Sequence, residues 1–248
     1  MNDARRVLVA AIVAAILVAS GVTVPRTTSV GAHAAQHSVN VGALRPPIVW
    51  HPFGYGPKRR AQMAAYSKRH YGVRTWRLTA PKVIVEHYTA GNSVTSVFNY
   101  YRANSPDLGE LPGVCAHFVI AENGTIYQEA PLWIRCRHAV GLNYTAIGIE
   151  HVGTSDAQVL HDHAQMRASL RLTLWLVAKF HIQVRNVIGH AEALMSPYHH
   201  ELYPSWRCYV HADWQHRDMI TYRGLLRKRA RTAGVPIGPA PVWVHPHC

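Results

Sequence analysis

Residues 115–128 read CAHFVIAENGTIYQ, and this stretch predicts a β-hairpin near the middle of the chain. Two apolar runs, residues 117–120 and 125–127, flank the dipeptide Asn123-Gly124. Asn-Gly favours a tight turn between antiparallel strands, because both residues tolerate a positive φ. We therefore expect part of the fold to be antiparallel sheet.

Further strands are predicted on both sides of this hairpin. Residues 83–85 are a compact β-branched run, residues 146–152 centre on Ile147 and Ile149, and residues 186–189 form a short apolar run that ends in Gly. Helical patterns lie between these runs, over residues 58–71 (ended by Gly72), 94–101 (capped by Asn92-Ser93), 163–180 and 218–231. Strands interleaved with helices predict an α/β or mixed α+β domain of about 160 residues.

The N-terminus has the features of an export signal. Arg5 and Arg6 precede a nearly uninterrupted apolar stretch over residues 7–19, and residues 32–34 (Ala-His-Ala) offer a cleavage site. We expect residues 1–35 to be a signal peptide or, if it is not cleaved, an N-terminal anchor. The folded part then works outside the cytoplasm, as a secreted or cell-wall protein, and touches a membrane only if this segment is retained.

The remaining chain divides into three expected parts. Residues 20–50 show little periodicity and are interpreted as a linker. The predicted divisions after the signal are a basic linker with an N-terminal helix (36–75), a catalytic domain (76–232) and a Pro-rich C-terminal tail (233–248).

Composition limits the class of protein. Hydrophobic residues make up 48% of the chain and charged residues 16%, which excludes a disordered polyelectrolyte. The formal net charge is +13, which requires an anionic partner or an anionic neighbourhood. The basic residues are spread along the chain, so we do not expect nucleic acid. An exported protein more often meets anionic wall polymers or anionic lipid, and these are the expected partners.

The four cysteines are expected to meet an oxidising environment after export. Cys115 and Cys136 lie 21 positions apart on either side of the predicted hairpin, so they are the predicted disulfide. Closing that loop contributes about 3 kcal/mol in the chain-entropy model. Cys208 and Cys248 remain, and their pairing is left open. The absence of a CxxC motif argues against a thiolate zinc site.

Two histidines follow the predicted buried strands directly. His87 comes after residues 83–85 and His190 comes after residues 187–189. Imidazoles at the ends of neighbouring strands can converge on one metal ion, and Zn²⁺ favours such ligands. A third ligand must come from elsewhere in the chain, and the nearest downstream cluster of acidic and imidazole groups is at residues 211–213.

Four segments together resemble one known family. They are VIVEHYTAG (83–91), CAHFVIAENGTIYQ (115–128), CRHAVGLNYTAIGIEHVG (136–153) and NVIGHAEAL (186–194). In this order they are similar to the zinc-dependent N-acetylmuramoyl-L-alanine amidases, a family that includes phage lysozyme-type amidases and peptidoglycan recognition proteins. The resemblance spans roughly residues 76–232. It implies a central mixed β-sheet flanked by helices, with a zinc ion in a groove that receives the peptidoglycan stem peptide.

The resemblance also implies a set of zinc ligands. His87 and His190 match the first two ligands of the family. The third is an Asp or Cys two positions after a Lys or His, a pattern that Asp213 and His211 match. Residues 196–209 replace a short Gly/Pro-rich loop of the family and contain three competing candidates: His199, His200 and Glu201.

The general base implied by the resemblance is Glu150, the acidic residue of the IGIE motif. It would take a proton from zinc-activated water and pass it to the leaving amine. His211 would stabilise the oxyanion of the tetrahedral intermediate. Some members place a Tyr immediately before the histidine of the hairpin motif, where this chain has Ala116, so more of the catalysis is expected to depend on Glu150.

Two further residues of these motifs are expected to meet the substrate. His138 is predicted to line the substrate groove and Asn143 to hydrogen-bond the substrate, whereas His117 is expected to pack. The predicted function is an exported peptidoglycan hydrolase that cleaves the amide between N-acetylmuramic acid and L-alanine of the stem peptide. The alternative is a peptidoglycan-binding module without turnover, a condition that typically follows loss of a zinc ligand.

Overall fold

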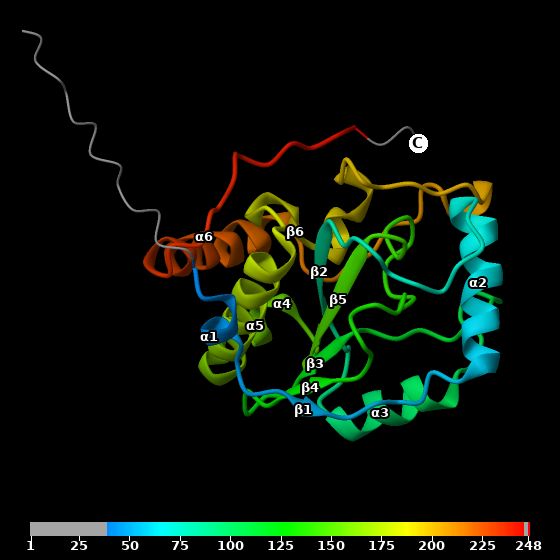
Figure 1. Ribbon diagram of the computed structural model, residues 1–248, viewed down its shortest axis with the longest axis horizontal. Coiled ribbons are helices and arrows are strands. Elements are labelled where there is room, and N and C mark those ends of the chain that lie inside the picture. The colour runs from blue at the N-terminus through cyan, green and yellow to red at the C-terminus, as the bar shows by residue number, and fades with distance from the viewer. Residues whose placement is uncertain (1–38, 246–247) are drawn as a thin grey trace, which may run out of the picture. The chain divides into compact units, whose positions relative to one another are not determined.

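The protein is described here by a computed structural model, which covers residues 39–245 and residue 248 (Figure 1). The predicted signal or anchor at residues 1–35 lies outside the described residues. Within the part of the chain that is described, no helix has the length and apolar character that a membrane span requires.

The centre of the fold is a six-stranded sheet in the order β1-β4-β3-β5-β2-β6. Strands β3 and β4 form the antiparallel hairpin predicted from the Asn-Gly turn, and the other neighbouring pairs are parallel. The expected mixed sheet is confirmed. The strands are β1 (Val49–Trp50), β2 (Val83–Tyr88), β3 (Phe118–Ile120), β4 (Ile126–Gln128), β5 (Ala146–His151) and β6 (Val187–Gly189).

Helices cover both faces of this sheet. In Figure 1, α5 and α6 lie on one side of the strands, and α2 and α3 lie on the other. The α-helices are α1 (Val41–Leu44), α2 (Pro57–Tyr71), α3 (Val94–Ala103), α4 (Asp156–His161), α5 (His163–Phe180) and α6 (His216–Thr232). Three short 3₁₀ helices complete the described elements: η1 (Val184–Asn186), η2 (His190–Met195) and η3 (Pro204–Trp206).

Helix α5 illustrates why local sequence predicts these elements well. The Asp162 side chain accepts hydrogen bonds from the backbone N–H groups of Ala164 and Gln165, which satisfies two orphan donors at the helix start. Its apolar stripe, which includes Leu170 and Leu174, is buried against the sheet in the main core. Each such side chain contributes about 1.5–3 kcal/mol through burial. The helix has the bounds that the sequence pattern predicts.

Two predictions about element boundaries were wrong. Strand β2 continues to Tyr88, so His87 lies inside the strand and not after it. The reason is that six residues of β2 pair with β5, so the strand extends beyond the apolar run at residues 83–85. The predicted linker at 20–50 contains helix α1 and strand β1 where it is described, and β1 pairs with β4. A two-residue strand is too short to show any periodicity in sequence.

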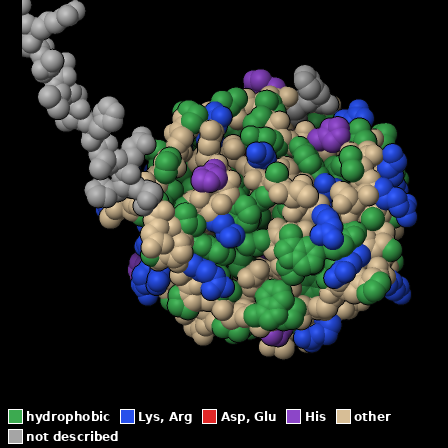
Figure 2. Space-filling view, in the orientation of Figure 1, with side chains coloured by type: hydrophobic (Ala, Val, Ile, Leu, Met, Phe, Trp, Pro, Cys, Tyr) green, Lys and Arg blue, Asp and Glu red, His purple; other side chains and the backbone are tan. Residues whose placement is uncertain are grey.

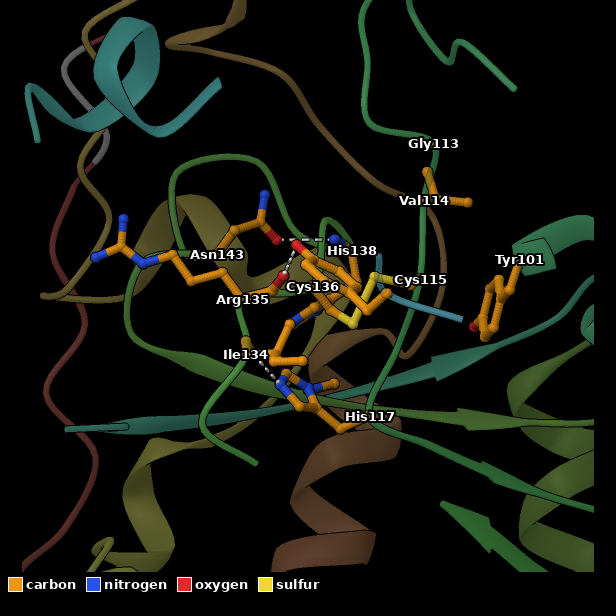
Figure 3. Close-up of a disulfide and its surroundings, with 12 residues drawn as sticks. Tyr101, Gly113, Val114, Cys115, His117, Ile134, Arg135, Cys136, His138 and Asn143 are labelled. Carbon is orange, nitrogen blue, oxygen red and sulfur yellow. Dashed lines mark hydrogen bonds between the residues drawn. A yellow bond between two sulfur atoms is a disulfide. The ribbon is translucent and has the colours of Figure 1, made fainter. Parts of the chain in front are cut away.

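Two disulfides are present among the described residues. The predicted Cys115–Cys136 bond is confirmed (Figure 3). Cys208 bonds Cys248, the pairing that the sequence left open. This second bond ties the end of the Pro-rich tail to the loop before α6, and the tail also packs through the N–H of Val244, which donates to the carbonyl of Met195 at 3.0 Å.

Candidate active site

Two neighbouring parallel strands, β2 and β5, bring the first site residues together. His87 on β2 lies opposite Glu150 on β5, so both side chains point to the same face of the sheet. His190 follows the last residue of β6, the other neighbour of β2. Because successive side chains in a strand alternate, Glu86 and His151 point to the opposite face, toward α5 and α6.

Three side chains converge at this end of the sheet. The Nδ1 atoms of His87 and His190 are 2.9 Å apart. Asp213 places Oδ1 at 3.0 Å from Nδ1 of His190 and Oδ2 at 3.3 Å from Nδ1 of His87. Across residues 39–245 and 248, this is the one group of His, Cys, Asp or Glu donors close enough to hold a metal ion.

The competing third ligands lie elsewhere. Glu201 is buried, and its Oε1 is 2.8 Å from Nδ1 of the buried His70. The loop that carries His199 and His200 is held by the N–H of His200, which donates to the carbonyl of Gly141. The structure brings Asp213, and not these residues, to the two histidines.

The charge states of Asp213 and His190 suit a cation, whereas the hydrogen bond with Asp213 and the nearby carboxylates raise the pKa of His87 against the effect of its burial. Burial alone would raise the pKa of Asp213, yet hydrogen bonds with His190 and His87 hold it well below its ordinary value. Burial and the neighbouring His87 lower the pKa of His190 to about 4. An ionised carboxylate and a neutral imidazole are the forms that bind a metal.

Glu150 lies beside this group in a partly buried position. Burial raises the pKa of its carboxyl to about 7; the charge of His87 lowers it and that of Asp213 raises it further. Its Oε2 atom has no hydrogen-bond partner in the region that the structure describes. A carboxylate with a pKa near neutrality and a free oxygen is suited to proton transfer.

Asn143 is fully buried and shapes the loop that carries His138. Its Oδ1 accepts hydrogen bonds from the backbone N–H groups of His138 and Ala139, each at 2.8 Å (Figure 3). The Nδ1 atom of His138 lies 3.0 Å from Nε2 of His87, so this loop also contacts a candidate ligand. The amide of Asn143 is therefore engaged by the protein, and its predicted contact with substrate stays a prediction.

His211 and His117 occupy different surroundings. The ring of His211 stacks on His190 with the centroids 3.3 Å apart, and burial together with His190 lowers its pKa to about 2. His117 is buried under the loop: its Nε2 contacts the carbonyl of Ile134 at 2.9 Å (Figure 3). Its Nδ1 accepts a hydrogen bond from the N–H of Gly148. His117 packs, as expected.

A groove runs past these side chains. One pocket, of about 350 Å³, is lined by His87, Glu150, His190 and Asp213. It shares Arg137, His138 and His190 with a second pocket that extends toward Tyr209 and His211. On the other side it shares Tyr101 and Glu150 with a third pocket along α3. An extended ligand can therefore lie across the candidate metal ligands.

A family model described as N-acetylmuramoyl-L-alanine amidase matches residues 77–202, about half of the chain. The chain belongs to this amidase family. Among curated proteins, none matches the chain.

Several solved structures are similar to this amidase. N-acetylmuramoyl-L-alanine amidase LysC from Clostridium intestinale is 26% identical with a TM-score of 0.42, and the match covers 59% of this chain and 83% of LysC. A mutant endolysin from Bacillus subtilis is 23% identical with a TM-score of 0.41, covering 59% and 84%. Human PGRP-IBETAC, in complex with glycosamyl muramyl pentapeptide, is 19% identical with a TM-score of 0.41, covering 54% and 86%.

Two residues that position the amidase site were missed by sequence reasoning. Asp156, at the start of α4, accepts hydrogen bonds from the backbone N–H groups of Trp214 and Gln215, each at 2.7 Å, and so fixes the chain immediately after Asp213. A side chain at Gly189 would collide with the carbonyl of Trp214, so glycine allows that loop to approach His190. The position of Gly189 directly before His190 could have indicated its role from the sequence. Asp156 gave no such indication, because in the sequence it is only an acidic residue at the start of a helix.

Proposed function

We propose that this protein is an exported zinc-dependent N-acetylmuramoyl-L-alanine amidase. Its substrate is the amide between the lactyl group of N-acetylmuramic acid and L-alanine of the stem peptide. One observation carries the proposal: in a chain of the amidase family, His87, His190 and Asp213 converge beside Glu150 in a groove.

The spacing of the three donor atoms supports zinc as the metal. Neighbouring ligand atoms of a tetrahedral zinc site lie about 3.3 Å apart when the bonds are about 2.0 Å long. The distances among Nδ1 of His87, Nδ1 of His190 and the Asp213 oxygens are 2.9, 3.0 and 3.3 Å. A zinc ion held there supplies Lewis-acid chemistry: it polarises a carbonyl group and makes water acidic enough to ionise near neutral pH.

Glu150 acts as the general base and then as the general acid. It accepts the proton that water releases as the water oxygen bonds to the amide carbonyl carbon. It returns this proton to the L-alanine nitrogen as the carbon–nitrogen bond breaks, which yields a free lactyl carboxyl group and a free amine. The unpartnered Oε2 of Glu150, noted above, is the atom suited to this transfer.

His211 supports the same reaction from the other side of His190. Its lowered pKa keeps the imidazole neutral, so one ring nitrogen carries a proton and can donate. Its Nε2 has no partner within the described chain. This nitrogen donates a hydrogen bond to the oxyanion that forms on the substrate carbonyl. His138, on the wall of both adjoining pockets, contacts the bound substrate.

Export is supported by the disulfides and the surface charge. Disulfides such as Cys115–Cys136 persist in oxidising compartments and are rare in the cytosol. In the parts of the chain that the structure describes, Glu122 is the one exposed acidic residue, whereas many Lys and Arg residues are exposed. Figure 2 shows Lys and Arg side chains scattered across one face. Such a surface retains the enzyme among anionic wall polymers.

Digestion of purified peptidoglycan tests the proposal. The mature protein with zinc should release stem peptides that begin with a free L-alanine amine and leave glycan strands intact, as read by mass spectrometry. Chelation should stop the release and added zinc should restore it. If the lactyl–alanine linkages stay intact with zinc bound while the protein still sediments with peptidoglycan, the non-catalytic binding module is the correct function instead.

A further inference from the structure

Tyr101, near the end of α3, is held rigidly at the edge of the groove. Its side chain is only 3% exposed, and its ring meets Phe53 edge to face with the centroids 5.9 Å apart. The backbone carbonyl of Tyr101 accepts a 2.6 Å hydrogen bond from Nη1 of the buried Arg59. These contacts fix where the phenol group can point. Figure 3 shows Tyr101 beside the disulfide that anchors the groove wall.

The hydroxyl of Tyr101 has no hydrogen-bond partner among residues 39–245 and 248, although it is buried. Buried hydroxyl groups are normally paired, because leaving one unpaired costs free energy. Tyr101 and Glu150 line the same two adjoining pockets, and the Oε2 of Glu150 is also unpaired. Two unpaired polar groups therefore line the same stretch of the groove.

The protonation of the phenol sets the direction of any hydrogen bond between them. Burial and the charge of Glu150 raise the pKa of Tyr101 well above its ordinary value. The hydroxyl therefore keeps its proton and donates, and an ionised carboxylate can only accept. The ring packs on Phe53 and the backbone of Tyr101 is held by Arg59, which restricts the direction from which the donor can approach the carboxylate.

We propose that Tyr101 is a positioning residue for Glu150. Its hydroxyl donates a hydrogen bond to one carboxylate oxygen and so turns the other oxygen toward the water that attacks the substrate. This inference rests on the proposed amidase function, because it assigns Tyr101 a part in the proton transfer made by Glu150. A base held in one orientation reaches the reacting geometry more often than a base that rotates freely.

Removal of the hydroxyl alone tests the positioning role. Tyr101→Phe keeps the ring that packs on Phe53, and we expect it to lower kcat on a soluble N-acetylmuramoyl-L-alanyl peptide by about 10-fold or more, with KM changed less than about 2-fold. The matched control is Tyr222→Phe, a buried hydroxyl on the opposite face of the sheet that bonds Ser169 and Thr173. It should lower the melting temperature and leave kcat unchanged.

A double mutant separates action through Glu150 from an independent effect. In the Glu150→Gln background, Tyr101→Phe should change the residual kcat less than about 2-fold, because the base that Tyr101 positions is already absent. An equal loss of kcat in both backgrounds, or no loss in the single variant, would show that Tyr101 does not act through Glu150.

Crystal structures of the wild type and of Tyr101→Phe provide a readout that needs no turnover. We expect one Glu150 orientation in the wild type, with an oxygen bonded to the Tyr101 hydroxyl, and a rotated or divided carboxylate in the variant. An unchanged Glu150 in both structures overturns the positioning role even if the protein is an amidase. A changed Glu150 in a protein that cleaves no peptidoglycan supports the contact and instead refutes the proposed function.

Discussion

Strands β2 and β5 each carry a Glu followed by a His, and the two faces of the sheet use these residues differently. Glu86-His87 and Glu150-His151 are neighbours in the parallel ladder. His87 and Glu150 face the groove, where they meet His190 and Asp213. Glu86 and His151 face α5 and α6. The same residue types, one position apart, therefore have different surroundings.

The helix-facing pair belongs to a hydrogen-bonded network. Glu86 accepts from Oγ1 of Thr173 at 3.0 Å, and His151 contacts the carbonyl of His87 and Oγ of Ser169, each at 2.8 Å. Tyr222 joins Ser169 to Thr173. On the groove face, Oε2 of Glu150 and Nε2 of His190 are without hydrogen-bond partners in the described structure; Oε2 of Glu86 is also without one there, but Glu86 is fully buried on the helix side. The hydrogen bonds on the helix side stabilise packing, whereas unpaired groups that line the groove remain available to a ligand.

Substitution of the histidines should give the largest difference in zinc binding and activity between the groove face and the helix face. His87→Ala should abolish zinc retention and lower activity by about 10³-fold or more, because one of the three proposed metal ligands is lost. His151→Gln should retain stoichiometric zinc, since His151 does not face the metal donors, and should instead lower stability. Elemental analysis of both purified variants checks this. Equal zinc loss in the two variants would contradict the division between the faces.

The glutamates give the next largest difference. Glu150→Gln should keep zinc and lower kcat by about 10²- to 10⁴-fold, because the amide side chain cannot take the proton. Glu86→Gln, one strand away on the helix side, should lower kcat less than about 3-fold. Steady-state kinetics on a soluble muramyl peptide measure both values. A comparable loss in Glu86→Gln would mean that the buried network takes part in catalysis.

The smallest expected effect is on stability, measured on zinc-free protein. Burial raises the pKa of Glu150 from an ordinary 4.5 to about 7, so folding disfavours its ionised form. This cost is absent below pH 4.5, grows between pH 4.5 and 7, and is complete above pH 7. Glu150→Gln should therefore raise the free energy of unfolding by about 1–3 kcal/mol at pH 8 and leave it unchanged at pH 4.

Denaturant unfolding at pH 4, 6 and 8 checks this sign. The burial of Glu86 also raises its pKa to about 7, but its hydrogen bonds with Tyr222 and Thr173 act in the opposite direction. Glu86→Gln disturbs those bonds, so it should raise the free energy of unfolding at pH 8 by less than Glu150→Gln does. A gain that is the same at all three pH values would show that ionisation of Glu150 is not its cause.

Much of the fold and of the candidate site could be read from short segments. The Asn123-Gly124 turn predicts the hairpin, and the apolar stripe of α5 predicts that helix with its observed bounds. Gly72, in the left-handed region with a φ of 76°, ends α2 as expected. These signals need only residues within a few positions of one another, because capping, turns and helical periodicity are local interactions.

Other features could not be read in this way, because they depend on residues far apart in the chain. The parallel register of β2 and β5 decides that His87 and Glu150, and not Glu86 and His151, face the groove. The loop held by Asp156 brings Asp213 to the histidines. Tyr101 reaches the groove from another element, helix α3.

The amino-acid sequence by itself determined the class of fold, the hairpin, most helices, the family and the pair of candidate histidine ligands. Only the tertiary structure decided which face of the sheet each of these Glu and His side chains points to, the convergence of Asp213, and not Glu201, on the two histidines, and the pairing of Cys208 with Cys248. The physical reason for this division is the distance along the chain over which each interaction acts. Local backbone preferences act within one or two turns of chain, whereas convergence of side chains requires strand register and loop packing across the whole domain.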